Sequence, residues 1–146
     1  MKAKELMIGD WVRISHRNKI GKVYRVDETN GNGNGWAAVI DGDYHERDLE
    51  PIPLTSELLE KNGFERVPQP GCANPYHWML EKYEEESDGL LFRIKAFNNP
   101  FRGMFVSIDN PSACETISFG KQIEFVHELQ HALRICEIEL DIKLEG

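Results

Sequence analysis

One long helical pattern, over residues 123–136, constrains the fold of this chain more than any other feature. On a helical wheel that turns about 100° per residue, its apolar side chains fall within about 60° of Leu129. These side chains are Phe125, Val126, Ala132, Leu133 and Cys136. An apolar stripe of this kind packs against a sheet, and the segments around it are short runs of alternating polarity, which predict strands. The sequence therefore predicts a mainly β, α+β protein.

Residues 1–52 have the pattern of short strands separated by glycine-rich turns. We expect strands at 11–14, 19–26, 36–40 and 44–47. The run 30–35 fits a hairpin tip, because its three glycines permit positive φ angles. Strands this short and this close together predict a small β-barrel or a strongly bent sheet.

Two segments of this region, Gly9-Asp10-Trp11-Val12-Arg13-Ile14 and Gly21-Lys22-Val23-Tyr24-Arg25-Val26, resemble the start of a KOW-type SH3-like barrel. That family opens with Gly-Asp-x-Val and places a second glycine before an alternating strand. The resemblance implies a binding platform, often for RNA or protein, and it implies no catalytic residue. We therefore expect an SH3-like β-barrel domain over residues 1–52.

Residues 53–146 have the pattern of a second, α+β domain. After a proline-containing connector, Thr55 is suited to cap a short helix over 56–62, and Gly63 is suited to end it. Strands are expected at 64–67, 76–83, 90–97, 104–108 and 115–119. The alternating tail, 138–144, predicts a last half-exposed strand after the long helix.

A second resemblance covers most of the chain. The segments Leu49-Glu50-Pro51-Ile52-Pro53-Leu54-Thr55, Leu59-Glu60-Lys61-Asn62-Gly63-Phe64 and Phe125-Val126-His127-Glu128-Leu129-Gln130 resemble a family of small uncharacterised proteins from gut bacteria and their phage-like elements. In that family the last segment often resembles Tyr-Val-His-Gln-Leu-Gln-Asn. This chain differs from that pattern at Glu128 and His131, and the resemblance implies a phage-related origin but no activity.

The net charge of −8 excludes a chain that coats nucleic acid or anionic membrane with its whole surface. Residues 1–26 nevertheless carry +5, and the other 120 residues carry −13. The basic side chains Arg13, Arg17, Lys19, Lys22 and Arg25 are either a contact patch or the solvated outward positions of short strands. Three widely spaced cysteines and the lack of a long apolar run predict a cytoplasmic protein without membrane contact.

The segment His127-Glu128-Leu129-Gln130-His131 matches H-E-x-x-H, the helix of zinc peptidases. In such a site His127 and His131 would bind zinc and Glu128 would be the general base. A catalytic zinc also needs a third protein ligand, and the extended pattern fails because Arg134 and Glu137 replace its glycine and histidine. A carboxylate from 84–86 or Asp109 would have to close the site. The alternative interpretation, which we prefer, is a solvated polar helix face.

Other candidate sites are weaker. Cys72 with His77, and Cys114 with Cys136, match no metal-ligand spacing, and a buried cysteine usually behaves as a small hydrophobe. The run 30–35 lacks the lysine of a phosphate-binding loop. Trp11, Trp36 and Trp78 can stack on nucleobases if they are exposed, and otherwise belong to the core.

These patterns together predict a binding or adaptor protein without enzymatic activity, whose N-terminal barrel contacts a protein or a nucleic acid. The alternative is a zinc-dependent hydrolase that uses the helix at 127–131.

Overall fold

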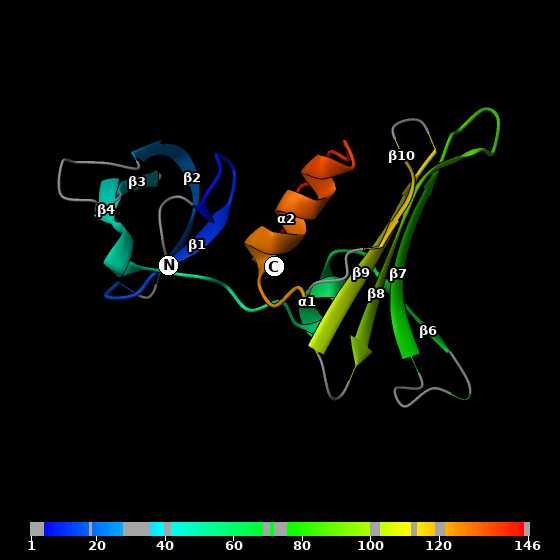
Figure 1. Cartoon of the computed structure of the whole chain (residues 1–146), viewed down its shortest axis with the longest axis horizontal. Coiled ribbons are helices and arrows are strands. Elements are labelled where there is room, and N and C mark those ends of the chain that lie inside the picture. The colour runs from blue at the N-terminus through cyan, green and yellow to red at the C-terminus, as the bar shows by residue number, and fades with distance from the viewer. Residues whose placement is uncertain are drawn as a thin grey trace. The chain divides into compact units, whose positions relative to one another are not determined.

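A computed structural model describes residues 5–17, 19–27, 36–39, 42–68, 71, 76–99, 103–111, 114–118 and 122–144. Within these residues the chain forms two antiparallel five-stranded sheets and two α-helices (Figure 1). The predicted mainly β, α+β class is therefore confirmed. None of the helices in the described part is long and apolar enough to cross a bilayer.

The contacts divide the chain into two units. The first unit contains residues 1–53 and 125–131, and the second contains 54–124 and 132–146. The division thus falls within helix α2 (Val126–Ile135). The domain boundary expected after residue 52 stays a prediction.

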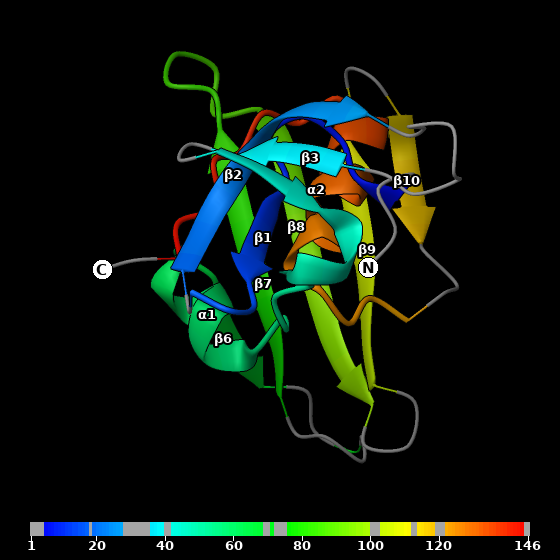
Figure 2. The same cartoon turned by 90° about the vertical axis from the view of Figure 1, so that its left-hand side faces the viewer.

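The first unit contains strands β1 (Trp11–Ile14), β2 (Lys19–Asp27), β3 (Trp36–Val39), β4 (Gly42–His45) and β5 (Leu49–Glu50). Their order in the sheet is β4-β3-β2-β1-β5, and a 3₁₀-helix (Glu46–Asp48) connects β4 to β5. Strand β2 pairs with β1 at its start and with β3 at its end, and it bends between the two (Figure 2). The predicted hairpin tip at 30–35 lies outside the described residues.

The core of the first unit follows from the alternation of its strands. Val12, Ile14 and Val23 point to the same side and are buried with Leu6, Tyr44 and Leu49, which together form one apolar cluster. Among the described strands of this sheet, β4 and β5 are the outermost. A closed SH3-like barrel is not seen in the described residues, so that part of the expectation stays a prediction.

The second unit contains helix α1 (Ser56–Lys61) and strands β6 (Glu65–Pro68), β7 (Tyr76–Tyr83), β8 (Leu90–Asn99), β9 (Gly103–Asn110) and β10 (Cys114–Ser118). The strands follow one another in the sheet as β10-β9-β8-β7-β6, an antiparallel meander of the five strands expected in this region (Figure 1, green to yellow). Ile94, Ala96, Val106 and Ile108 are buried at alternating positions of the neighbouring strands β8 and β9.

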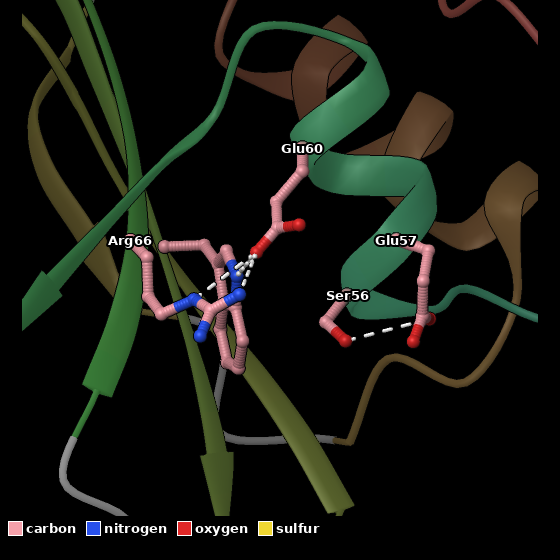
Figure 3. A network of polar contacts seen from close by, with 5 residues as sticks. Ser56, Glu57, Glu60 and Arg66 are labelled. Carbon is pink, nitrogen blue, oxygen red and sulfur yellow. Dashed lines mark hydrogen bonds and ion pairs between the residues drawn. The ribbon is translucent and has the colours of Figure 1, made fainter.

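Helix α1 begins and ends as its sequence predicts. The Thr55 side chain accepts a hydrogen bond from the Leu58 N–H (3.2 Å), and Gly63 ends the helix with a φ of 92°. One carboxylate oxygen of Glu60 accepts hydrogen bonds from Trp78 Nε1 (3.1 Å) and Arg66 Nη2 (3.0 Å), so the helix is tied to β6 and β7 (Figure 3). The Trp78 bond, followed by the Arg66 bond, lowers the pKa of Glu60.

The expected strand at 138–144 does not form, and this prediction was wrong. Its alternation is nevertheless present, because Ile138 and Ile142 are buried while Glu139, Asp141 and Lys143 are exposed. At Lys143 the partner of the backbone is a side chain. The Asn62 amide donates to the Lys143 carbonyl (2.8 Å) and accepts from the Lys143 N–H (2.6 Å), so a side chain takes the place of a neighbouring strand at that residue.

Candidate functional site

The zinc hypothesis needs Glu128 as a general base, but this side chain forms a hydrogen bond at the start of helix α2. Glu128 Oε1 accepts a hydrogen bond from the backbone N–H of Phe125 (3.1 Å), three residues earlier. This is the reciprocal half of a capping box, in which the third helical residue bonds back to the residue before the helix. The Val126 N–H also donates to the Ile52 carbonyl (2.8 Å). Glu128 therefore has a structural function at the helix start.

The polar face of α2 in the first unit contacts the turn that precedes β1. Gln130 donates to the Gly9 carbonyl (2.9 Å), and its side-chain oxygen accepts from the Trp11 N–H (3.0 Å). His131 Nε2 lies 2.6 Å from Asp10 Oδ2, and because a carboxylate accepts, the imidazole donates. The same Asp10 oxygen accepts from the Met7 N–H (2.8 Å), and Asp10 is completely buried.

His127 lies beside this contact. Its ring stacks on the Phe125 ring (centroids 5.9 Å apart, planes at 11°) and meets the His131 ring edge-on (5.5 Å, 76°). Its Nδ1 is buried and has no hydrogen-bond partner among the described residues. Burial lowers the pKa of His127, and the nearby His131 lowers it further, against opposing effects of Asp10, Glu128 and Glu5.

The expectation that the polar face of α2 is solvated is therefore wrong. His127 is 6% exposed and Gln130 is 8% exposed, while the His131 side chain is 25% exposed. The reason is that the turn before β1 offers backbone groups and a carboxylate to this polar face. Sequence reasoning did not connect Asp10 or Gln130 with the two histidines, because the partners are about 120 residues apart. The only signal was the Gly-Asp pair that opens the first β segment.

The carboxylate beside His131 comes from Asp10 and not from 84–86 or Asp109, where the sequence suggested it. Asp109 lies on β9 near Arg93 (3.9 Å). In the part of the chain that the structure describes, no three His, Cys, Asp or Glu side chains are placed to hold a metal ion. Two ligand atoms of one tetrahedral zinc lie about 3.3 Å apart, whereas the His131 and Asp10 atoms are at hydrogen-bond distance. The zinc hypothesis stays a prediction.

The predicted basic residues lie on and around the β1–β2 hairpin. Trp11 and Arg13 of β1 pair with Lys22 and Ile20 of β2, and these four side chains point away from the buried Val12 and Ile14. The Lys22 ammonium lies 5.1 Å above the Trp11 ring, a cation–π contact. Arg13 and Lys22 thus share one face with an indole ring. We call Trp11, Arg13, Ile20, Lys22 and Tyr24 the hairpin face.

A β-bulge in β2 places the next two side chains on the surface. Val23 pairs with Val39 and Arg25 pairs with Ala38, so Tyr24 is the extra residue. Regular alternation would bury one member of a consecutive pair, but here Tyr24 is 53% exposed and the Arg25 side chain is 57% exposed. Arg25 also forms an ion pair with Asp43 (2.8 Å). The bulge therefore presents an aromatic ring and a guanidinium side by side.

The other two predicted basic residues lie in the turn between β1 and β2 and directly after it. The Arg17 guanidinium lies 5.9 Å from the centroid of the Tyr44 ring, and Lys19 is exposed at the start of β2. Arg13 and Lys22 thus lie on the hairpin face and Arg25 lies at its bulge. Lys19 pairs with the buried Ile14, so its position belongs to the other face of the hairpin.

The remaining candidates divide between the core and undescribed residues. Trp78 and Cys136 are buried. The His77 ring lies 5.2 Å from the Phe97 ring, and burial, then Lys95, lowers the pKa of His77. Cys72 lies outside the described residues, as do the side chains of Cys114 and Trp36.

Comparison with known proteins gives no assignment. The chain matches no protein-family model, no curated protein and no solved structure.

Proposed function

We propose that this chain is a binding protein, without enzymatic activity, that contacts nucleic acid through the hairpin face of its first unit. One observation carries the proposal: the Trp11 ring with Lys22 above it, on the same face as Arg13 and next to the exposed Tyr24 and Arg25. Aromatic rings and cations on one strand pair are the side chains that stack on bases and contact phosphates.

The distribution of charge supports the choice of this face. Residues 1–26 carry +5 while the rest of the chain carries −13, so a polyanion is attracted to the hairpin and repelled elsewhere. The resemblance to KOW-type barrels supports the same choice, since it implies a platform for RNA or protein. The second resemblance supports a phage-related setting.

The test is the salt dependence of binding to a labelled oligonucleotide, measured by fluorescence anisotropy between about 50 and about 200 mM salt. Each lost phosphate contact reduces the slope of log K against log salt by about 0.7 to 0.9. We expect the variant R13Q/K22Q to bind more weakly and to show a slope smaller by about 1.5.

The matched control is K82Q/K143Q, which removes the same charge from two exposed lysines of the second unit. It should keep the slope of the unchanged protein. Binding that is independent of salt, or an equal loss in both double variants, would refute the proposal.

A zinc-dependent hydrolase is the alternative function, and the contacts of its three residues give it less support. Glu128 caps its own helix, and His131 is hydrogen-bonded to Asp10. Protein purified without an affinity column should contain zinc at well below one ion per chain. Stoichiometric zinc that is lost in His131→Ala would favour the hydrolase instead.

A further inference from the structure

We infer that the nucleic acid is a single strand, with successive bases stacked on Trp11 and Tyr24; this inference rests on the proposed function. The two rings belong to neighbouring strands and to the same face of the sheet. Trp11 lies opposite Lys22, and Tyr24 follows Lys22 by two residues along β2. They are therefore diagonal neighbours.

The spacing of the two rings distinguishes a single strand from a duplex. Diagonal side chains on paired strands lie about 7–8 Å apart. Bases within a duplex are stacked about 3.4 Å apart along each strand. In a duplex, successive bases already stack on each other, so two rings about 7–8 Å apart cannot each stack on one of them. An extended single strand can present one base to each ring, since every base has an accessible flat face.

Lys22 connects stacking to phosphate contact. Its ammonium lies over the Trp11 ring at the end of a flexible four-carbon chain. A base can replace the ammonium above the ring, and the ammonium can then turn to the phosphate of the same nucleotide. Arg13 lies two residues from Trp11 on β1 and on the same face. It would contact the phosphate of the neighbouring nucleotide.

Acidic residues border the hairpin face on both edges of the sheet. Glu50 on β5 lies opposite Arg13 in the strand register, and Asp43 on β4 forms an ion pair with Arg25. Strands β4 and β5 are the outermost strands of this sheet. The basic strip is thus narrow, and the second phosphate strand of a duplex would approach one of these carboxylates. A single phosphate backbone needs only the strip between Glu50 and Asp43.

The experiment compares a mixed-sequence single strand of about 12 nucleotides, as RNA and as DNA, with the duplex of the same sequence. Dissociation constants of the full chain are measured by fluorescence anisotropy. We expect the single strands to bind at least about tenfold more tightly than the duplex. Tyr24→Leu should weaken single-strand binding by about 5- to 100-fold and leave duplex binding unchanged, while Tyr24→Phe should retain most of the affinity.

Trp11→Leu should have the same effect as Tyr24→Leu, after circular dichroism has shown that it folds. Because Tyr24 is half exposed, its variants keep the test decisive if Trp11→Leu unfolds. Equal binding of single strand and duplex, or an unchanged affinity in Tyr24→Leu while R13Q/K22Q binds weakly, would overturn the inference and leave the proposed function in place. Binding of no oligonucleotide at all would overturn both.

Discussion

At the scale of single residues, Asp10 connects the two segments that the sequence made most conspicuous. It belongs to the Gly-Asp pair before β1, and its carboxylate is bonded by His131 of the H-E-x-x-H segment and by the Met7 N–H. Spacing alone made the two histidines a metal-site hypothesis. The contacts instead assign to His131 a hydrogen bond, to Glu128 a capping bond and to His127 a place in the interior.

Replacing Asp10 should test this structural function. In the unchanged protein, His131 and the Met7 N–H both donate to the buried Asp10 carboxylate. Because Asp10→Asn replaces this carboxylate with a neutral amide, we expect the free energy of unfolding to fall by about 1–3 kcal/mol. Urea denaturation measures the change. Asp88→Asn is the matched control: Asp88 is exposed in the β7–β8 turn with a φ of 56°, which asparagine tolerates, so its effect should stay within about 0.5 kcal/mol. Equal effects of the two substitutions would contradict this function of Asp10.

Stability should depend on pH through His127. Because burial holds its pKa below the ordinary value of 6.5, the folded chain binds fewer protons at this residue than the unfolded chain. Its contribution is complete above about pH 6.5 and is lost as the pH falls below that value. Stability measured between about pH 7.5 and about pH 5 should therefore decrease less in His127→Phe than in the unchanged protein. A difference of zero across that range would show that His127 titrates normally.

At the scale of elements, the strands were predictable wherever polarity alternates between clear turns. Strands β7 to β9 and helix α1 lie close to their expected ranges, because alternation, Thr55 and Gly63 each act locally. The tail at 138–144 shows the limit of this reasoning. Alternation predicted which of its side chains are buried, but a strand also needs a neighbouring strand, and that partner is not encoded in the segment itself.

The tail depends on Asn62 instead. Its side chain forms hydrogen bonds with the Leu58 carbonyl (2.9 Å) and with both backbone groups of Lys143. Asn62→Ala should lower the free energy of unfolding by about 1–2 kcal/mol and remove the protection of the Lys143 amide from hydrogen exchange. Asn62→Asp, which keeps the acceptor, should retain that protection in part. Full protection of the Lys143 amide in Asn62→Ala would show that the tail is held by other contacts.

At the scale of the whole molecule, the sequence predicted the fold class and the separation of charge, but not the contacts between distant segments. Helical periodicity identified a polar face on α2, and nothing in that periodicity indicated that Gly9, Asp10 and Trp11 would bind it. The hairpin face had a similar limit. Alternation placed Lys22 and Tyr24 together, but only the register with β1 put Trp11 beneath Lys22, and only the bulge exposed Arg25 beside Tyr24.

Binding of nucleic acid to the hairpin face can be mapped residue by residue on the protein. The ¹⁵N-labelled chain is titrated with a single strand of about 12 nucleotides, and the shift of each backbone amide signal is followed by NMR. If the hairpin face binds the strand, the largest changes occur in β1 and in β2 from Lys19 to Arg25, with smaller changes in β7 to β9. Changes concentrated in β7 to β9 or at residues 127–131, with β1 and β2 unaffected, would contradict binding at this face.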